Sequence, residues 1–194
     1  MDNSFLSEAV YVLRKGGVIL YPTDTVWGLG CDATDPDAVS KIYGIKKRSD
    51  SKSLVLLASD LDMIARYVRE VPEMAVQLVE VNDRPMTIVY PDAIVGKENG
   101  GLAHNVVAQD GSVGIRIPMA DFCRELVRRF GRPIVSTSAN LSGEPTPKRY
   151  ADISEQVREA ADYTLDPSLE KESVGTASSI IKVGTDGTIA IIRK

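Results

Sequence analysis

Short apolar runs alternate with segments of helical periodicity along most of this chain of 194 residues. Residues 5–14 carry apolar side chains at helical spacing, and Gly16 and Gly17 are expected to end that helix. The run 18–21 has the composition of a buried strand, and Asp35 and Pro36 suit the cap and first position of a second helix. This alternation predicts an α/β domain.

The rest of the chain continues the alternation and ends in a predicted hairpin. Further strands are expected over residues 53–58, 86–90, 112–117 and 133–136, and further helices from Ser59 to residue 66, from Pro72 onward, and over residues 121–130 and 154–161. Residues 177–183 and 188–192 are expected to pair across a turn at Thr185-Asp186-Gly187, which favours a mixed sheet over a purely parallel one. Residues 91–110 are rich in Gly and Asn and predict a loop with one short helix. No internal repeat is present, and residues 1–194 are predicted to form a single domain.

Composition is that of a globular protein, with 43 % hydrophobic and 26 % charged residues. The formal net charge of −4 argues against binding RNA over a broad surface, although a local basic pocket for a small anion is compatible with it. The single histidine, His104, excludes a multi-histidine metal site and disfavours a Ser-His-Asp hydrolase. Cys31 and Cys123 have no metal-like spacing and are expected to be free, buried thiols. Neither a signal peptide nor a membrane span is apparent, so the cytoplasm is the expected location.

The whole chain lacks the sequence motifs of the familiar phosphate-binding loops. Two candidate segments for a functional site lie in its first third. Residues 21–30 run from a strand into two threonines, a carboxylate and the only tryptophan. They could line a polar pocket, or they could form a Thr/Asp-rich turn over a core tryptophan. Residues 46–52 contain four cations, Lys46, Lys47, Arg48 and Lys52, just past a predicted helix end. This segment is either a phosphate clamp or a solvated charge run that complements the helix dipole.

Two more candidate segments follow predicted strands. In residues 112–118, Ser112, Gly114 and Arg116 would share one face of a strand, which suits an anion site where Gly114 allows close approach, or an amphipathic edge strand. In residues 136–143, successive hydroxyls and backbone N–H groups could form a nest for phosphate oxygens, or a turn and helix cap. None of the four segments is specific alone, but their order is.

The segments YPTDTVWGLGCDA, IKKR, SVGIRIP and STSANLSG, in this order, resemble the YrdC/Sua5 family over the chain from about residue 7 to the C-terminus. Two motifs distinguish that family: KxR, here Lys46 and Arg48, and SxN, here Ser138 to Asn140. The resemblance implies a twisted mixed α/β sheet, flanked by helices, around a basic groove. It also implies a nucleotidyltransferase that joins L-threonine, bicarbonate and ATP into threonylcarbamoyl-AMP and pyrophosphate.

The resemblance assigns roles residue by residue. Lys46 and Arg48 would be catalytic. Threonine would be contacted by Thr25, Arg116, Ser136 and Ser178. ATP would be contacted by Arg48, Lys52, Ser112, Ser138, Asn140 and Arg193. Mg²⁺ would arrive with ATP, with no metal site made by protein alone.

The resemblance also implies what surrounds the reaction. Separate transferase proteins would pass the threonylcarbamoyl group to tRNA adenosine, and this chain would bind RNA weakly at most. The chain resembles the short form of the family, without the additional C-terminal domain of longer relatives. One alternative is an RNA-binding module without catalysis, which the acidic charge disfavours. Another is a paralogue with a different carbamoyl donor or acceptor, which the intact SxN motif disfavours.

Overall fold

One mixed β-sheet organises the computed structural model, which describes residues 4–47 and 54–194. Within these ranges the strand order is β7-β1-β2-β6-β3-β5-β4-β8-β9. The strands are β1 (Ile19–Tyr21), β2 (Gly28–Gly30), β3 (Val55–Leu57), β4 (Met86–Tyr90), β5 (Val113–Arg116), β6 (Ile134–Ser138), β7 (Tyr163–Thr164), β8 (Ser179–Val183) and β9 (Ile189–Arg193). The pairs β1–β7, β3–β5 and β4–β8 are parallel and the other neighbours are antiparallel, which confirms the predicted mixed sheet.

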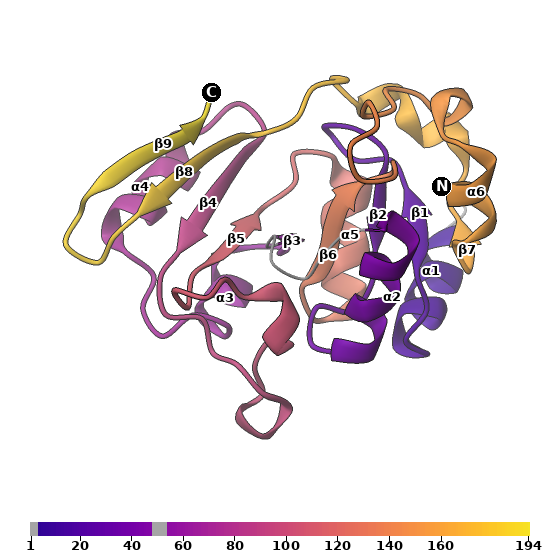
Figure 1. Ribbon diagram of the computed structural model, residues 1–194. Helices are drawn as coiled ribbons and strands as arrows, with labels where there is room; N and C mark the ends of the chain where they lie inside the picture. The colour runs from indigo at the N-terminus through magenta and orange to yellow at the C-terminus, as the bar shows by residue number, and fades with distance from the viewer. Residues whose placement is uncertain (1–3, 48–53) are drawn as a thin grey trace.

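Helices flank the two halves of this sheet. They are α1 (Ser4–Arg14), α2 (Pro36–Lys46), α3 (Leu61–Ala65), α4 (Glu73–Val81), α5 (Asp121–Phe130) and α6 (Glu155–Glu159), with 3-10 turns η1 (Lys97–Asn99), η2 (His104–Val106), η3 (Tyr150–Asp152) and η4 (Pro167–Glu172). Figure 1 shows α1, α2 and α5 beside β1, β2 and β6, and α4 beside β4, β8 and β9. Strands β3 and β5 join the two halves. None of the helices in the described ranges is long and apolar enough to cross a membrane.

Local capping explains where two helices begin. The Asp35 carboxylate accepts hydrogen bonds from the backbone N–H groups of Asp37 and Ala38, and Pro36 follows it, as predicted for α2. The prediction that Ser59 caps the next helix is wrong. Asp60 is the cap, because its carboxylate accepts the Met63 N–H at 2.7 Å while Ser59 donates its hydroxyl to Asp60.

Strand β2 was not predicted, because Gly28, Leu29 and Gly30 show no apolar alternation. It pairs with β1 on one side and β6 on the other, and all three residues are buried. A Cβ atom at Gly30 would lie 2.7 Å from the Tyr21 ring and 2.9 Å from the Val135 carbonyl oxygen. Glycine therefore allows the three strands to pack this closely.

The remaining predicted elements are confirmed with small shifts of their ends. Helix α5 and strand β4 have the predicted bounds, and β8 and β9 form the predicted hairpin. The loop over residues 91–110 contains two 3-10 turns where one short helix was predicted. Cys31 and Cys123 are buried free thiols, as expected.

Strand register brings polar residues from distant parts of the sequence onto one face of the sheet. Val55 in β3 pairs with Gly114 in β5 and with Ser136 in β6, so these three residues lie in one row. Arg116 is two residues beyond Gly114 and therefore lies on the same face. This face carries the site described next.

Candidate functional site

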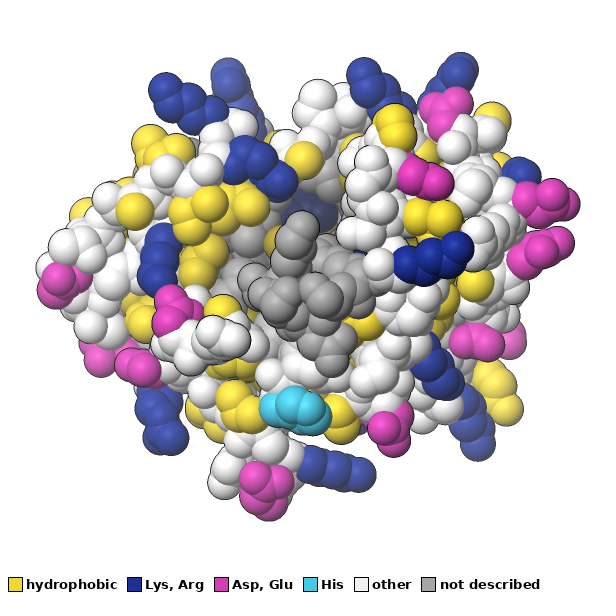
Figure 2. Space-filling model, viewed as in Figure 1, with side chains coloured by type: hydrophobic (Ala, Val, Ile, Leu, Met, Phe, Trp, Pro, Cys, Tyr) yellow, Lys and Arg dark blue, Asp and Glu magenta, His cyan; other side chains and the backbone are white. Residues whose placement is uncertain are grey.

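A polar cavity of about 300 Å³ opens on this face of the sheet. Its walls come from the β1–β2 connection, the ends of β5 and β6, and the start and end of the β8–β9 hairpin. Its polar lining includes Thr25, Arg116, Ser136, Ser138, Ser178 and Arg193. The structure therefore brings together six of the residues that the family resemblance singled out. Figure 2 shows one face of the molecule, where Lys and Arg side chains are scattered among acidic ones around the margin.

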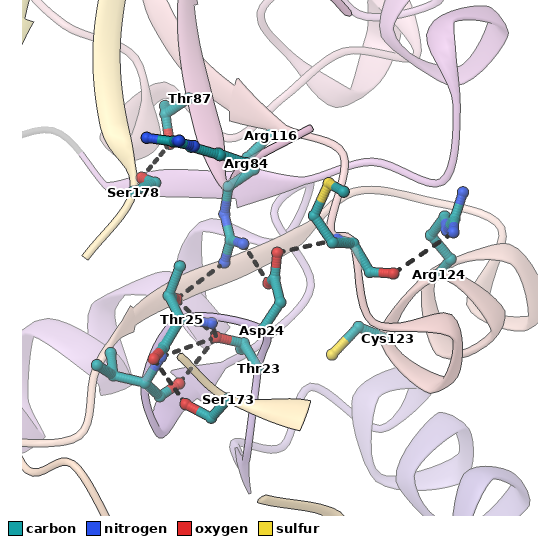
Figure 3. A network of polar contacts seen from close by, with 12 residues as sticks. Thr23, Asp24, Thr25, Arg84, Thr87, Arg116, Cys123, Arg124, Ser173 and Ser178 are labelled. Carbon is teal, nitrogen blue, oxygen red and sulfur yellow. Dashed lines mark hydrogen bonds and ion pairs between the residues drawn. The ribbon is translucent and has the colours of Figure 1, made fainter. Parts of the chain in front are cut away.

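A buried ion pair fixes the arginine of this cavity. The side chains of Arg116 and Asp24 are each 3 % exposed, and Arg116 Nη1 donates to Asp24 Oδ1 (Figure 3). Arg116 Nη2 donates to Thr25 Oγ1 at 3.3 Å, and the Met119 backbone N–H donates to Asp24 Oδ2 at 2.9 Å. The guanidinium group is thus held in one orientation at the cavity wall.

The segment from Thr23 to Thr25 is itself held from a distant part of the chain. The hydroxyl oxygens of Thr23 and Thr25 are 2.7 Å apart. The Thr25 carbonyl oxygen accepts hydrogen bonds from the Ser173 hydroxyl at 2.6 Å and from the Gly175 N–H at 2.8 Å. Sequence reasoning missed Ser173, because nothing local signals a contact across 148 positions.

Trp27 forms another wall of the cavity and is fully buried. Its indole N–H donates to Glu170 Oε2 at 2.6 Å, and the same oxygen accepts the Tyr150 backbone N–H at 2.8 Å. The Trp27 and Tyr150 rings also pack with centroids 5.1 Å apart. Residues 21–30 were predicted either to line a polar pocket or to form a turn over a core tryptophan. The structure shows features of both, since Trp27 is packed in the core and also lines the pocket.

Lys46 connects the KxR and SxN motifs. Its ammonium group donates to the backbone carbonyl oxygens of Ser138 and, at 2.7 Å, of Asn140. Lys46 is buried and is not among the residues that line the cavity. The structure thus places Lys46 against the backbone of the SxN loop. The other predicted phosphate contacts of this segment, Arg48 and Lys52, lie outside the described residues.

Two further predicted ATP contacts lie away from the cavity lining. Asn140 borders a neighbouring depression and donates its side-chain amide to the Glu144 carbonyl oxygen at 2.7 Å. Ser112 donates its hydroxyl to Asp110 at 2.5 Å, and Asp110 is in turn bonded to Lys182 at 2.7 Å. Ser112 is therefore engaged at the end of β5 remote from Arg116.

The hairpin side of the cavity is tied together by Ser178. Its hydroxyl oxygen lies 2.8 Å from that of the buried Thr87, and its carbonyl oxygen accepts two hydrogen bonds from Arg193, at 2.7 and 2.9 Å. In the core beside the lining residue Ser136, burial raises the pKa of the Tyr21 hydroxyl, and a hydrogen bond with Ser136 partly offsets this. Tyr21 therefore stays neutral, and the charge of the described cavity lining comes from Arg116 and Arg193.

The chemistry of this cavity suits an anionic or zwitterionic ligand. Two arginines and several hydroxyls line it, and arginine recognises carboxylates and phosphates through paired N–H groups. A larger cavity of about 470 Å³ lies beyond β5, where apolar side chains such as Leu61 and Met86 share the lining with charged ones such as Asp62 and Arg124. Within the described ranges, no group of three or more His, Cys, Asp or Glu residues could hold a metal ion.

Known proteins resemble this chain in sequence and structure. The family model Sua5_yciO_yrdC, described as "Telomere recombination", matches residues 11–194. A protein of Stenotrophomonas maltophilia named threonylcarbamoyl-AMP synthase is 35 % identical over 168 residues, which is 86 % of this chain and 88 % of that protein. One of the same name from Pseudoalteromonas translucida is 31 % identical over 191 residues, or 97 % of each.

Two solved structures with the same fold are those of P. abyssi Sua5 and E. coli YciO. P. abyssi Sua5 complexed with L-threonine has a TM-score of 0.82 and 27 % identity, and covers 92 % of this chain. This chain spans only 50 % of that longer protein. E. coli YciO has a TM-score of 0.79 and 25 % identity, with 100 % of this chain and 90 % of YciO covered.

Proposed function

Because this chain belongs to the Sua5/YciO/YrdC family, as the sequence motifs predicted, we propose that it is a threonylcarbamoyl-AMP synthase. The reaction joins L-threonine, bicarbonate and ATP, and releases pyrophosphate. The two relatives of this name described above are 35 % and 31 % identical over 86 % and 97 % of this chain. The observation that carries the proposal is the buried, oriented Arg116 in a cavity lined by hydroxyls.

Arg116 is the proposed partner of the threonine carboxylate. A guanidinium offers a carboxylate two parallel N–H groups, and this one is already fixed in orientation by Asp24 and Thr25. Thr25, Ser136 and Ser178 present hydroxyls to the same cavity, where they would bind the amine and hydroxyl of threonine. The P. abyssi Sua5 structure with L-threonine supports an amino-acid subsite in this fold.

The nucleotide is proposed to lie along the SxN loop and the hairpin. Ser138 and Arg193 line the cavity, and Asn140 borders the depression next to it. Arg48 and Lys52 are proposed as phosphate contacts on the basis of the motif. Lys46 would support them by fixing the backbone of the SxN loop from behind, since its ammonium binds two carbonyl oxygens there.

Mg²⁺ is proposed to enter with ATP and to take its ligands from phosphate oxygens and water, as it commonly does at nucleotide sites. The carboxylate beside the cavity, Asp24, already has both oxygens engaged, by Arg116 and by the Met119 N–H. The donor set therefore fits a metal bound through the nucleotide. Bound there, Mg²⁺ would neutralise phosphate charge.

Positioning and charge neutralisation would supply most of the catalysis. The uncharged threonine amine attacks the carbon of bicarbonate, and water leaves to give a carbamate. A carbamate oxygen then attacks the α-phosphorus of ATP, and pyrophosphate leaves. This chain needs to form no covalent bond to any of the three substrates, and it would hold the reacting groups close while cations stabilise the charge on phosphate oxygens. The product would pass to separate proteins that modify tRNA.

The nine described strands form one sheet, which supports a single domain across residues 1–194. A cytoplasmic location and at most weak RNA binding are proposed with the function, because tRNA would receive the product from other proteins. The acidic net charge of −4 is compatible with that division of labour.

Pyrophosphate release tests this function. We expect release with ATP, Mg²⁺ and bicarbonate only when threonine is present, together with threonylcarbamoyl-AMP detected by mass spectrometry. Release that ignores threonine would contradict the proposal. RNA binding with a steep salt dependence and no pyrophosphate would instead identify an RNA-binding module.

A further inference from the structure

The Asp24 carboxylate lies beside the guanidinium of Arg116, which lines the cavity (Figure 3). Its two oxygens accept hydrogen bonds from Arg116 and from the Met119 backbone N–H, and its side chain is 3 % exposed. Arg116 lines the cavity, whereas Asp24 is not among the lining residues. Asp24 therefore acts on a ligand only through its charge and through the orientation that it gives to Arg116.

The contact geometry leaves the arginine ready for a planar anion. A guanidinium carries five N–H groups, and here Asp24 engages one on Nη1 and Thr25 engages one on Nη2. Thr25 is in turn fixed through its carbonyl oxygen by Ser173 and Gly175. The orientation of the guanidinium is thus set before any ligand arrives, which reduces the entropy lost on binding.

Charge adds a second effect to this orientation. Without a counter-charge beside it, Arg116 would attract every small anion, and polyanions most strongly. Arg116 and Asp24 together carry no net charge. A dianion such as phosphate is attracted by Arg116 but repelled by the carboxylate beside it. A zwitterion, whose ammonium balances its carboxylate, suffers much less from the same repulsion.

Resting on the proposed function, we propose that Asp24 is a specificity-determining residue that keeps phosphate groups out of the amino-acid subsite. The proposed reaction brings ATP into this cavity and releases pyrophosphate there, so an arginine without a counter-charge would be blocked by substrate or product phosphates. Asp24 makes the Arg116 subsite selective for a net-neutral amino acid. Its role is in positioning and selectivity, because it touches no reacting atom.

The test compares phosphate binding by the full chain and by an Asp24→Asn variant, using calorimetry without ATP. We expect inorganic phosphate and pyrophosphate to bind the variant at least about tenfold more tightly, because one repelling charge is removed. Threonine should displace both anions from the variant. A merely structural role would weaken binding of every ligand, so the direction of the change separates the two explanations. Equal phosphate affinity in both proteins would overturn the proposal.

Two matched variants control the comparison. Asp32→Asn removes another buried aspartate that is paired with an arginine, Arg132, away from the cavity, and it should leave phosphate affinity unchanged. Asp24→Glu keeps the charge and should retain the low phosphate affinity of the unaltered chain. Tighter phosphate binding by Asp24→Glu would assign the effect to geometry and sink the charge argument.

The proposal stays testable if Asp24→Asn fails to fold. In the unaltered chain, phosphate should fail to compete with threonine, and competition at equal millimolar concentrations would overturn the proposal. The double variant Asp24→Asn with Arg116→Gln removes both charges, and it must show no tightened phosphate binding. These binding measurements need no turnover, so they remain informative if threonine-dependent pyrophosphate release is not found. Conversely, pyrophosphate release can be normal while phosphate binds the Asp24→Asn variant and the unaltered chain equally, which would overturn only the proposal for Asp24.

Discussion

Two buried aspartates of this protein bind arginines in very different surroundings. Asp24 pairs with Arg116, and both side chains are 3 % exposed at the wall of the polar cavity. Asp32 pairs with Arg132 at 2.9 Å, but the Arg132 side chain is 42 % exposed and lies over the Phe130 ring. The two carboxylates are similarly buried, so the difference lies in the arginine.

The hydrogen bonds that the two aspartates accept from residues other than their arginines also differ, since one set is local and the other is long-range. Asp32 satisfies its local turn, accepting the backbone N–H and hydroxyl of Thr34. Asp24 accepts from Met119, 95 positions away, and so ties the cavity wall to the chain beyond β5. Burying both partners of an ion pair costs desolvation that an apolar pair would avoid. The fully buried pair lies at the wall of the polar cavity, where we propose that threonine binds, and the partly solvated pair fixes a local turn.

Arg116→Ala should have the largest effect. It removes the proposed carboxylate partner and leaves Asp24 buried without its cation, which costs about 3–5 kcal/mol of folding stability. We expect threonine-dependent pyrophosphate release to fall to background, and urea unfolding to report the lost stability. Arg116→Lys, which keeps the charge but loses the paired N–H groups, should recover stability more than activity. Normal turnover by Arg116→Ala would show that threonine is held elsewhere.

Arg132→Ala should have a moderate effect on stability alone. The Arg132 side chain is partly solvated and Asp32 keeps its two bonds to Thr34, so we expect a loss of about 1 kcal/mol. The KM for threonine should not change. A raised KM would mean that the two ion pairs are coupled, and the functional contrast between them would have to be abandoned.

Lys182→Ala should have the smallest effect, because the Lys182–Asp110 pair is exposed, at 43 % and 54 %. We expect a loss below about 1 kcal/mol at neutral pH, reduced further by salt. Hydrogen bonds from Lys182 and Ser112 hold the pKa of Asp110 well below its usual range. The stabilisation is therefore present above about pH 4, where an unfolded aspartate ionises, and is lost as the pH falls below it. Thermal unfolding of both proteins at several pH values checks this, and a difference that grows in acid would contradict it.

The sequence predicted the elements that depend on neighbours within a few residues. Helix α5 and strand β4 have their expected bounds, and the Asp35 cap with Pro36 begins α2. Even the error at Ser59 is local, since the neighbouring Asp60 provides the stronger acceptor for the free N–H groups. Strand β2 could not be predicted in this way, because Gly28–Gly30 becomes a strand only through its neighbours β1 and β6.

The sequence predicted which residues line the candidate site better than it predicted the hydrogen bonds that these residues make. Motif order identified Thr25, Arg116, Ser136, Ser138, Ser178 and Arg193, and the fold brings all six to one cavity. Lys46 was predicted to be a catalytic phosphate contact and Ser112 an ATP contact. The motifs did not predict that the Lys46 ammonium binds backbone carbonyls of the SxN loop or that the Ser112 hydroxyl binds Asp110. Which of several similar partners a side chain binds depends on the distances between them in the folded protein, and sequence motifs do not give those distances.

The sequence by itself determined the alternation of strands and helices, the absence of a familiar phosphate loop, and the family to which the chain belongs. Those properties reside in local periodicity and in the order of short motifs. Only the tertiary structure decided that Asp24 faces Arg116 across 92 positions and that Ser173 holds Thr25 across 148. The reason is physical: burial makes a polar group find a partner, and which partner it finds depends on what the folded sheet places within hydrogen-bonding distance.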